Sequence, residues 1–277
     1  MPSLPFQRAF TPNSLRSPSG KLTITKQADA AALYDYVKSQ DQNKLQNDPK
    51  AVMNAIDYYV NNTKRMMIFS QPKLVATEKV LEQLHPKPKV LVELGGYVGK
   101  SALAWGLMLQ KFQQASQGDV KDVKVFSMEL EPEFAKMIRD FVDIAGLSGT
   151  VEVVQGQSGE SLKLLKAEKG IEHIDVLFLD HWKEFYVPDL RLCEELGLLK
   201  RGSVVVADNT DIPGAPDYLK YVESGGEGGW KYRCESIDIG SERGPVSFEL
   251  SLPIKIGGGD ADTKQSIVHF AYVEDTP

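Results

Sequence analysis

Acidic residues follow two apolar, β-type runs in the second half of the sequence. Asp180 comes directly after the run 174–179, and the pair Asp208 and Asn209 comes directly after the run 203–207. Because the carboxyl ends of parallel strands meet at one edge of an α/β sheet, these three side chains should lie together where such sheets bind ligands. Two carboxylates and one amide oxygen are hard ligands that leave coordination positions open, which predicts a Mg²⁺ site.

A lysine stands beside this predicted metal site. Lys183 lies three residues after Asp180, and a neighbouring divalent cation lowers the proton affinity of a lysine. We therefore predict that Lys183 acts as a general base near neutral pH. Between these two residues, His181 is expected to make a structural hydrogen bond, and Trp182 is expected to form a wall of the pocket.

A glycine-rich segment, Glu-Leu-Gly-Gly-Tyr-Val-Gly-Lys-Ser at 93–101, follows the first predicted strand and opens a helix. Its glycines would let the backbone approach a ligand closely, and the helix start offers free N–H groups. The spacing matches neither a Walker loop nor the G-x-G-x-x-G motif, although a nicotinamide cofactor stays open as an alternative. Glu129, at the end of the second predicted strand, suits the ribose hydroxyls of an adenosine-containing cofactor. Ser158, which starts the helix after the third strand, suits either contact with adenosine or helix capping.

Strands alternate with helices from residue 90 onward, which predicts an α/β protein with a mostly parallel sheet and helices on both faces. Three earlier helices are predicted over 28–39, 49–62 and 74–84. The predicted strands cover 90–93, 123–128, 151–154, 174–179 and 203–207, and the helices that follow them cover 101–112, 133–145, 158–166, 190–195 and 217–222. The β-rich runs 231–239, 246–252 and 267–273 lack intervening helices and predict antiparallel strands at the end of the sheet.

The composition favours a folded protein that acts on a small molecule. With 277 residues and 42% hydrophobic content, the chain can bury a full core. We expect a proline-rich arm over 1–20 and a single domain over 21–277, with N-terminal helices over 21–88 and the sheet core over 89–277. A net charge of −6 argues against binding to nucleic acid or to anionic membranes. Since no apolar run reaches the roughly 20 residues of a membrane span and no signal peptide is evident, we expect no membrane span and a cytoplasmic location.

Together these motifs resemble the catechol O-methyltransferases, enzymes that depend on S-adenosylmethionine and Mg²⁺ and have a Rossmann-like seven-stranded methyltransferase fold. The resemblance is carried by the glycine-rich segment at 93–101, by Phe-Leu-Asp-His-Trp-Lys at 178–183 and by Ala-Asp-Asn at 207–209. It extends to Pro-Gly-Ala-Pro-Asp at 213–217 and to Ala-Ile-Asp-Tyr-Tyr at 55–59. The N-terminal arm and the residues 251–265 lie outside it.

The resemblance implies a role for individual residues. It makes Asp180, Asp208 and Asn209 the Mg²⁺ ligands and Lys183 the base that deprotonates the substrate hydroxyl. The implied cofactor-binding residues are Phe69, Glu93, Gly95, Tyr97, Ser101, Glu129, Leu130, Gln157, Ser158, Asp180 and Trp182. The implied substrate-binding residues are Met67, Trp182, Lys183, Asn209, Pro213 and Glu249.

One segment departs from the family pattern. The family has Met-Asn-Val-Gly beside the cofactor, whereas this chain has Met-Ile-Phe-Ser at 67–70, and a preceding tryptophan is replaced by Arg65. The resemblance therefore implies conserved chemistry and leaves the acceptor open.

The predicted reaction is Mg²⁺-dependent transfer of a methyl group from S-adenosylmethionine to one hydroxyl of a catechol, by a protein that is a monomer, as the resemblance suggests. Three alternatives stay open. A related cation-dependent O-methyltransferase would act on another vicinal diol, such as a phenylpropanoid thioester. A non-catalytic binding protein would keep the methyltransferase fold alone. A nicotinamide oxidoreductase is disfavoured by the three metal-ligand side chains.

Overall fold

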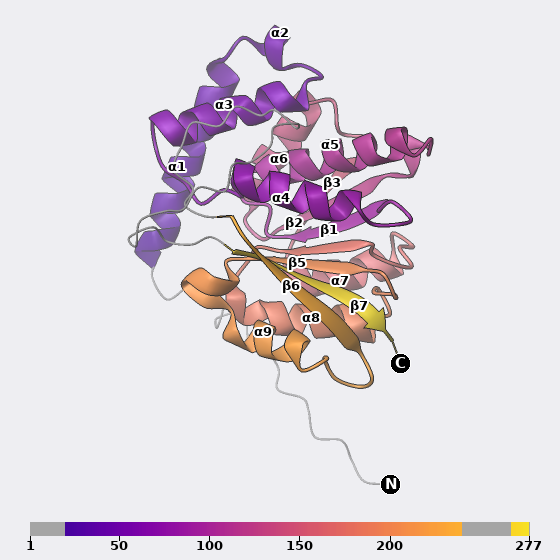
Figure 1. Cartoon of the computed structure of the whole chain (residues 1–277). Helices are drawn as coiled ribbons and strands as arrows, with labels where there is room; N and C mark the ends of the chain where they lie inside the picture. Colours follow the sequence, from indigo (N-terminus) through magenta and orange to yellow (C-terminus); the bar gives the residue numbers. More distant parts are fainter. Residues whose placement is uncertain (1–19, 240–266, 277) are drawn as a thin grey trace.

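The computed structural model describes residues 20–239 and 267–276. Within them the chain forms a seven-stranded sheet with the strand order β3-β2-β1-β4-β5-β7-β6 (Figure 1). The strands are β1 (Val90–Leu94), β2 (Lys124–Glu129), β3 (Val151–Gln155), β4 (Val176–Leu179), β5 (Val204–Asp208), β6 (Lys231–Asp238) and β7 (Ile267–Asp275). β1 to β5 pair in parallel, whereas β7 is antiparallel to both β5 and β6. The predicted mostly parallel sheet with an antiparallel end is confirmed, and the predicted strand over 246–252 lies outside the described residues.

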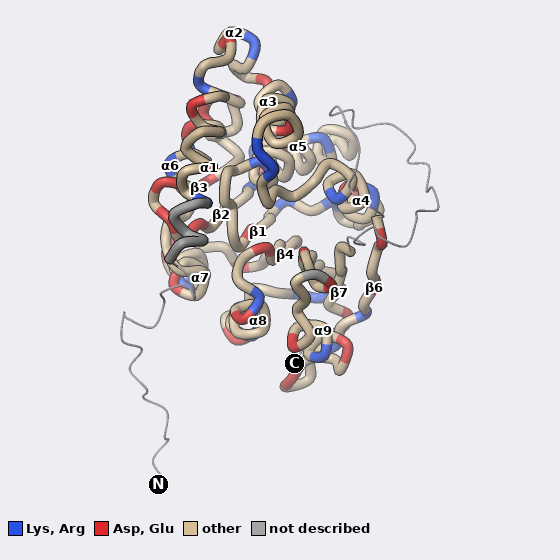
Figure 2. Tube along the Cα trace, turned by 90° about the vertical axis from the view of Figure 1, so that its left-hand side faces the viewer, with Lys and Arg blue, Asp and Glu red and all other residues tan. Residues whose placement is uncertain are grey.

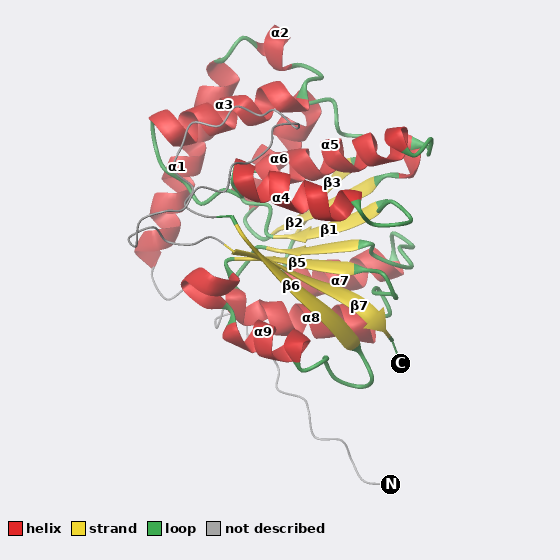
Figure 3. Ribbon diagram, viewed as in Figure 1, coloured by secondary structure: helices red, strands yellow, loops and turns green. Residues whose placement is uncertain are grey.

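Helices cover both faces of the sheet (Figure 3). They are α1 (Gly20–Ser39), α2 (Gln42–Leu45), α3 (Pro49–Asn62), α4 (Gln71–Glu82), α5 (Lys100–Ala115), α6 (Pro132–Ile144), α7 (Ser158–Ala167), α8 (Tyr186–Glu195) and α9 (Pro216–Glu223). α4, α5 and α6 lie on one face of the sheet, and α7, α8 and α9 lie on the other (Figure 1). No helix in the described part of the chain is both long enough and apolar enough to cross a membrane.

Local sequence explains where most helices begin, although several starts differ from the prediction. Asp48 caps α3 by accepting a hydrogen bond from the Ala51 N–H, and Pro49 occupies the first helical position, as predicted. α4 was predicted from residue 74 but begins at Gln71, because Pro72 fits a first helical turn, where its missing N–H costs nothing. α1 also begins earlier than predicted, at Gly20 rather than 28.

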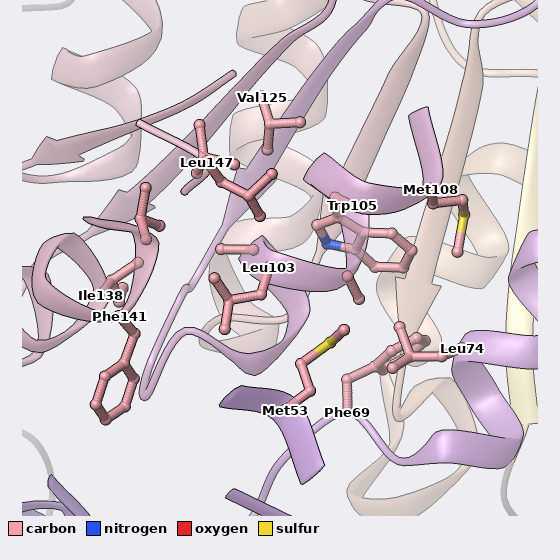
Figure 4. Close-up of a cluster of buried hydrophobic side chains, with 14 of the residues drawn as sticks. Met53, Phe69, Leu74, Leu103, Trp105, Met108, Val125, Ile138, Phe141 and Leu147 are labelled. Carbon is pink, nitrogen blue, oxygen red and sulfur yellow. The ribbon is translucent and has the colours of Figure 1, made fainter. Parts of the chain in front are cut away.

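The central strands are apolar on both faces, so that each face packs against its own helical layer. On β5, Val204 and Val206 belong to the core under α4 and α5, whereas Val205 and Ala207 belong to the core under α8 and α9. Figure 4 shows part of the first core, with Trp105 of α5 close to side chains from the segment before α4 and from α4 itself. This packing fixes the ends of β4 and β5, from which the predicted acidic residues emerge.

A buried histidine in this fold should make stability depend on pH. His269 of β7 is 1% exposed, its Nε2 has no hydrogen-bond partner, and burial lowers its pKa to about 4. In the unfolded chain the pKa of histidine is about 6.5. Between pH 6.5 and pH 4, His269 is therefore protonated in the unfolded state but neutral in the folded state. The stability that the protein has above pH 6.5 is lost as the pH falls toward 4.

We expect His269→Gln to remove this part of the acid sensitivity. Over the whole window the histidine accounts for about 3 kcal/mol of the free energy of unfolding. Urea denaturation at pH 7 and pH 4.5 would measure the loss in the wild type and in the variant. Equal losses in the two proteins would show that His269 already titrates normally in the folded state.

Candidate active site

The two predicted acidic segments meet at the carboxyl edge of the sheet. Asp208 is the last residue of β5, and Asp180 directly follows β4, its parallel neighbour. Asn209 comes next in a left-handed backbone conformation with φ of 54°. The structure thus places both carboxylates at adjacent strand ends, as the sequence pattern predicts.

The glycine-rich loop after β1 packs directly against this edge. Gly95 has φ of 100°, and a Cβ built on it would lie 2.8 Å from the backbone oxygen of Asp180. Any other residue would be strained and would also collide with the backbone of Asp180. The loop after β1 and the acidic loop after β4 are therefore in contact, and one ligand can touch both.

Lys183 reaches into the same edge from the short 3-10 helix η3 (Lys183–Phe185). Its Nζ lies 3.8 Å from Oδ1 of Asp180 and donates a hydrogen bond of 3.1 Å to the backbone oxygen of Asp208. It also donates to the hydroxyl of Tyr186, which in turn donates to the backbone oxygen of Leu179 at 2.6 Å. Burial lowers the pKa of Lys183, and the charge of Asp180 opposes that shift. A lysine with a lowered pKa at this position has the chemistry of a general base.

A second lysine occupies the site, and it was not among the predicted site residues. Lys73 of α4 places its Nζ 2.8 Å from Oδ1 and 3.1 Å from Oδ2 of Asp208. The partners are 135 residues apart in the chain. Lys73 stands in a helical segment with no acidic or glycine-rich motif around it, so no local pattern marks it as a site residue.

The two carboxylates are stabilised in their protonated forms by their surroundings. Burial raises the pKa of Asp208, and the charge of Lys73 opposes that shift. Burial raises the pKa of Asp180 well above its usual value, and the negative charge of Asp208 raises it further. Neighbouring carboxylates with raised pKa values are typical of a functional site.

Two glutamates lie under and beside the glycine-rich loop. Glu93 is fully buried and accepts hydrogen bonds from Nε1 of Trp105, at 3.0 Å, and from the hydroxyl of Ser127. Its burial raises its pKa to about 7. Glu129, at the end of β2, accepts from the N–H of Tyr97 at 2.8 Å, and burial raises its pKa. Glu129 is thus tied to the loop that a cofactor would contact, and Glu93 lies beneath it.

A narrow cavity brings several predicted site residues together. It lies between the segment before α4 and the glycine-rich loop, and its lining includes Met67, Phe69, Gly95, Tyr97, Ser101 and Asp180. A wider cavity of about 600 Å³ lies elsewhere, at the opposite edge of the sheet. Its charged lining residues form ion pairs such as Lys200 with Asp175 at 2.9 Å, and none of the predicted site residues lines it. The chemistry therefore assigns the candidate site to the narrow cavity.

Large apolar side chains are exposed around the predicted site. The large hydrophobic residues exposed in the described part of the chain are Tyr58, Met67, Leu130 and Trp182, and all but Tyr58 are predicted to contact cofactor or substrate. Trp182 is 45% exposed, and its ring faces the ammonium of Lys26 at 5.4 Å. Of these residues, Met67 also lines the narrow cavity, so a ligand bound there would cover part of its surface. Elsewhere, basic and acidic residues are interspersed along the outer helices (Figure 2).

The remaining predicted residues lie on several other segments. His181 places Nε2 2.7 Å from the carboxylate of Asp189, which confirms its expected structural hydrogen bond. Gln157 and Ser158 lie at the start of α7, and Pro213 lies in the turn η4 (Thr210–Gly214) that follows Asn209. Glu249 is outside the described residues. The described residues contain no group of three or more His, Cys, Asp or Glu side chains that could hold a metal ion.

Known proteins are similar to this chain in both sequence and fold. The family model described as "O-methyltransferase" matches residues 59–215. The mouse (Mus musculus) catechol O-methyltransferase is 34% identical over 217 residues, covering 78% of this chain and 76% of that protein. The bovine (Bos taurus) catechol O-methyltransferase is 35% identical over 193 residues, covering 70% of this chain and 65% of that protein. The crystal structure of the O-methyltransferase TomG from Streptomyces achromogenes, in complex with SAM, has a TM-score of 0.56 at 16% identity and covers 83% of this chain and 91% of that one.

The fold is thus that of the S-adenosylmethionine-dependent O-methyltransferases. Because the family model and these relatives match its sequence, the chain belongs to the catechol O-methyltransferase family. S-adenosylmethionine is the methyl donor of these methyltransferases.

Proposed function

We propose that this protein transfers the methyl group of S-adenosylmethionine to one hydroxyl of a catechol, with Mg²⁺ as a cofactor. The observation that carries the proposal is the position of the Lys183 Nζ, 3.8 Å from Asp180. Asp180 also lines the cavity at the glycine-rich loop. Base, proposed metal ligand and proposed cofactor cavity therefore converge on one carboxylate.

The proposed Mg²⁺ ligands are Asp180, Asp208 and Asn209. Their chemistry fits the ion, because Mg²⁺ prefers oxygen ligands and usually keeps open positions for water and substrate. The raised pKa values of both carboxylates also support the proposal, since a divalent cation would stabilise their ionised forms and offset the repulsion that raises the pKa of Asp180. When bound, the cation would chelate the two adjacent oxygens of a catechol and stabilise the ionised one.

In this proposal Lys183 supplies the proton acceptor and the protein supplies alignment. A phenol has a pKa on the order of 10 and is mostly protonated at neutral pH. Lys183 removes the hydroxyl proton and becomes an ammonium. The oxygen then forms a bond to the methyl carbon while the carbon–sulfur bond breaks, which leaves S-adenosylhomocysteine. Because the sulfonium is already electrophilic, holding the oxygen in line with it is the main task of the site.

The proposed cofactor contacts surround the glycine-rich loop. Glu129 would accept hydrogen bonds from the ribose hydroxyls, since it is fixed to the loop at Tyr97. Exposed Leu130 and Trp182 would cover the adenine. The other proposed contacts are Phe69, Glu93, Gly95, Tyr97, Ser101, Gln157, Ser158 and Asp180.

The proposed acceptor contacts come from several segments of the chain. Met67, Trp182 and Pro213 would form the walls, while Lys183 and Asn209 would contact the reacting oxygens. Glu249 would contact the second oxygen. Met67 is 67% exposed, so a bound acceptor could cover much of its surface.

Transfer of labelled methyl groups from S-adenosylmethionine to a panel of acceptors would test this function. The panel would contain catechols, matched single phenols and a phenylpropanoid thioester with adjacent hydroxyls, each assayed with Mg²⁺ and with excess EDTA. We expect labelling of catechols only, and only with Mg²⁺. Preference for the thioester would change the proposed acceptor. Labelling in EDTA would contradict the proposed role of Mg²⁺. Binding of the cofactor without methyl transfer would favour a non-catalytic protein.

A further inference from the structure

The carboxylate proposed as a metal ligand is already bound to a cation of the protein. Lys73 is 4% exposed and Asp208 is 3% exposed. The Nζ of Lys73 approaches both carboxylate oxygens, at 2.8 Å and 3.1 Å. A contact to both oxygens occupies the side of the carboxylate that faces α4, and it compensates the buried charge.

When its four charged groups are all ionised, this edge is neutral without a metal ion. Asp180 and Asp208 then supply two negative charges, and Lys73 and Lys183 supply two positive charges. Lys183 lies 3.8 Å from Asp180, so each carboxylate has its own lysine. A divalent cation placed between the carboxylates would therefore meet a site that is already neutral, and it would share Asp208 with Lys73.

We infer that Lys73 is a positioning residue that holds Asp208 in place when no divalent cation is bound and limits the affinity for that cation by competing for the same carboxylate. The inference rests on the proposed function, because it takes Asp208 as a metal ligand. Its consequence is a site whose carboxylate is ordered in advance and whose metal ion exchanges readily.

The surroundings of Lys73 make the inference testable by substitution. The Nζ of Lys73 lies 5.8 Å from the ring of Phe69, which belongs to the cavity lining. Phe69 is held independently by its packing against Phe178, at 4.9 Å between ring centroids, and against Trp105, at 5.6 Å. Lys73→Met keeps the length of the side chain and removes only its charge, so the cavity wall should stay in place.

A control exists in the same protein. Lys111 of α5 places its Nζ 2.7 Å from Oε1 of Glu78, a buried carboxylate of α4. This pair joins α4 to α5, and neither partner lines the cavity or is a proposed metal ligand. Lys111→Met therefore removes a lysine from a buried carboxylate away from the proposed site, and any general effect of losing such an ion pair will appear in both variants.

The experiment uses Mn²⁺ as the probe and the full chain. Binding of Mn²⁺ is measured by electron paramagnetic resonance, and thermal unfolding is followed in EDTA and in saturating Mn²⁺. We expect Lys73→Met to bind Mn²⁺ about tenfold more tightly than the wild type, because a neighbouring positive charge is gone. Its Tm should fall in EDTA and recover in Mn²⁺. Lys111→Met should lose Tm in both conditions and bind Mn²⁺ as the wild type does.

The outcomes separate this inference from the proposed function. If the wild type binds no Mn²⁺, the metal part of the proposed function fails and the inference falls with it. If the wild type binds Mn²⁺ and Lys73→Met binds it equally or more weakly, the inference alone is overturned. Should Lys73→Met not fold, Lys73→Gln gives the same test, since it can donate a hydrogen bond to Asp208 without a charge.

Discussion

Lys183→Met should reduce methyl transfer by about 10³-fold at saturating cofactor and acceptor, the effect typical of losing a general base. Methionine keeps the length and apolar stem of lysine but cannot take up a proton. The lysine Nζ is within 3.1 Å of the Asp208 backbone and 3.8 Å from the Asp180 carboxylate, so no other described lysine except Lys73 reaches this edge as closely. Lys73 cannot replace it, because its nitrogen already contacts both oxygens of Asp208. Single-turnover measurements with a catechol acceptor would give the rate of the chemical step.

The same variant should bind S-adenosylmethionine with nearly unchanged affinity, because Lys183 is absent from the cavity lining at the glycine-rich loop. Calorimetric titration would measure that affinity. Lys163→Met is a suitable control, since Lys163 is an exposed lysine of α7 that pairs with Glu160, and we expect it to change neither quantity. Loss of cofactor binding in Lys183→Met, with a normal rate once the cofactor is saturating, would contradict the role of base.

Asp208→Asn should have two large effects at once. It removes a proposed metal ligand, so methyl transfer should fall by about 10³-fold or more, since it loses what the cation contributes to ionising the acceptor. It also removes the carboxylate that pairs with the buried ammonium of Lys73. Removing one partner of a buried ion pair costs about 3 kcal/mol or more of the free energy of unfolding. Methyl-transfer assays and urea denaturation would measure the two effects separately.

The double variant Lys73→Met with Asp208→Asn distinguishes these causes. It removes both charges together, so most of the lost stability should return. The lost activity should not return, because the ligand is still missing. If the double variant is as unstable as Asp208→Asn alone, the instability arises from something other than the loss of the Lys73–Asp208 ion pair.

Much of the fold follows from local patterns in the chain. Strands between helices, and their uninterrupted apolar runs, predict a parallel sheet buried on both faces, and the pairing of β1 to β5 confirms it. Helix starts at Asp48-Pro49 are equally local, because capping depends on residues within one turn. The errors concern element ends. α4 begins at Gln71 and α8 at Tyr186, both earlier than predicted, because Pro72 and Pro188 fit first helical turns.

Some residues of the candidate site could likewise be predicted from local sequence, and others could not. Asp180, Lys183 and Asp208 are marked by their positions directly after apolar strands, which is information within a few residues of each. Tyr186, whose hydroxyl joins Lys183 to the backbone of Leu179, carried no such mark and was missed. Its role depends on the turn that η3 makes, which brings the start of α8 back under the strand end.

By itself, the amino-acid sequence determined the alternating α/β architecture, the acidic residues at two strand ends and membership in a methyltransferase family, because each depends on short-range periodicity or on contiguous motifs. Only the tertiary structure decided which charges compensate one another. Lys73 reaches Asp208 across 135 residues, and Lys100 reaches Asp57 across 43. A buried charge must find an opposite charge wherever packing places one, and no local spacing encodes that distance.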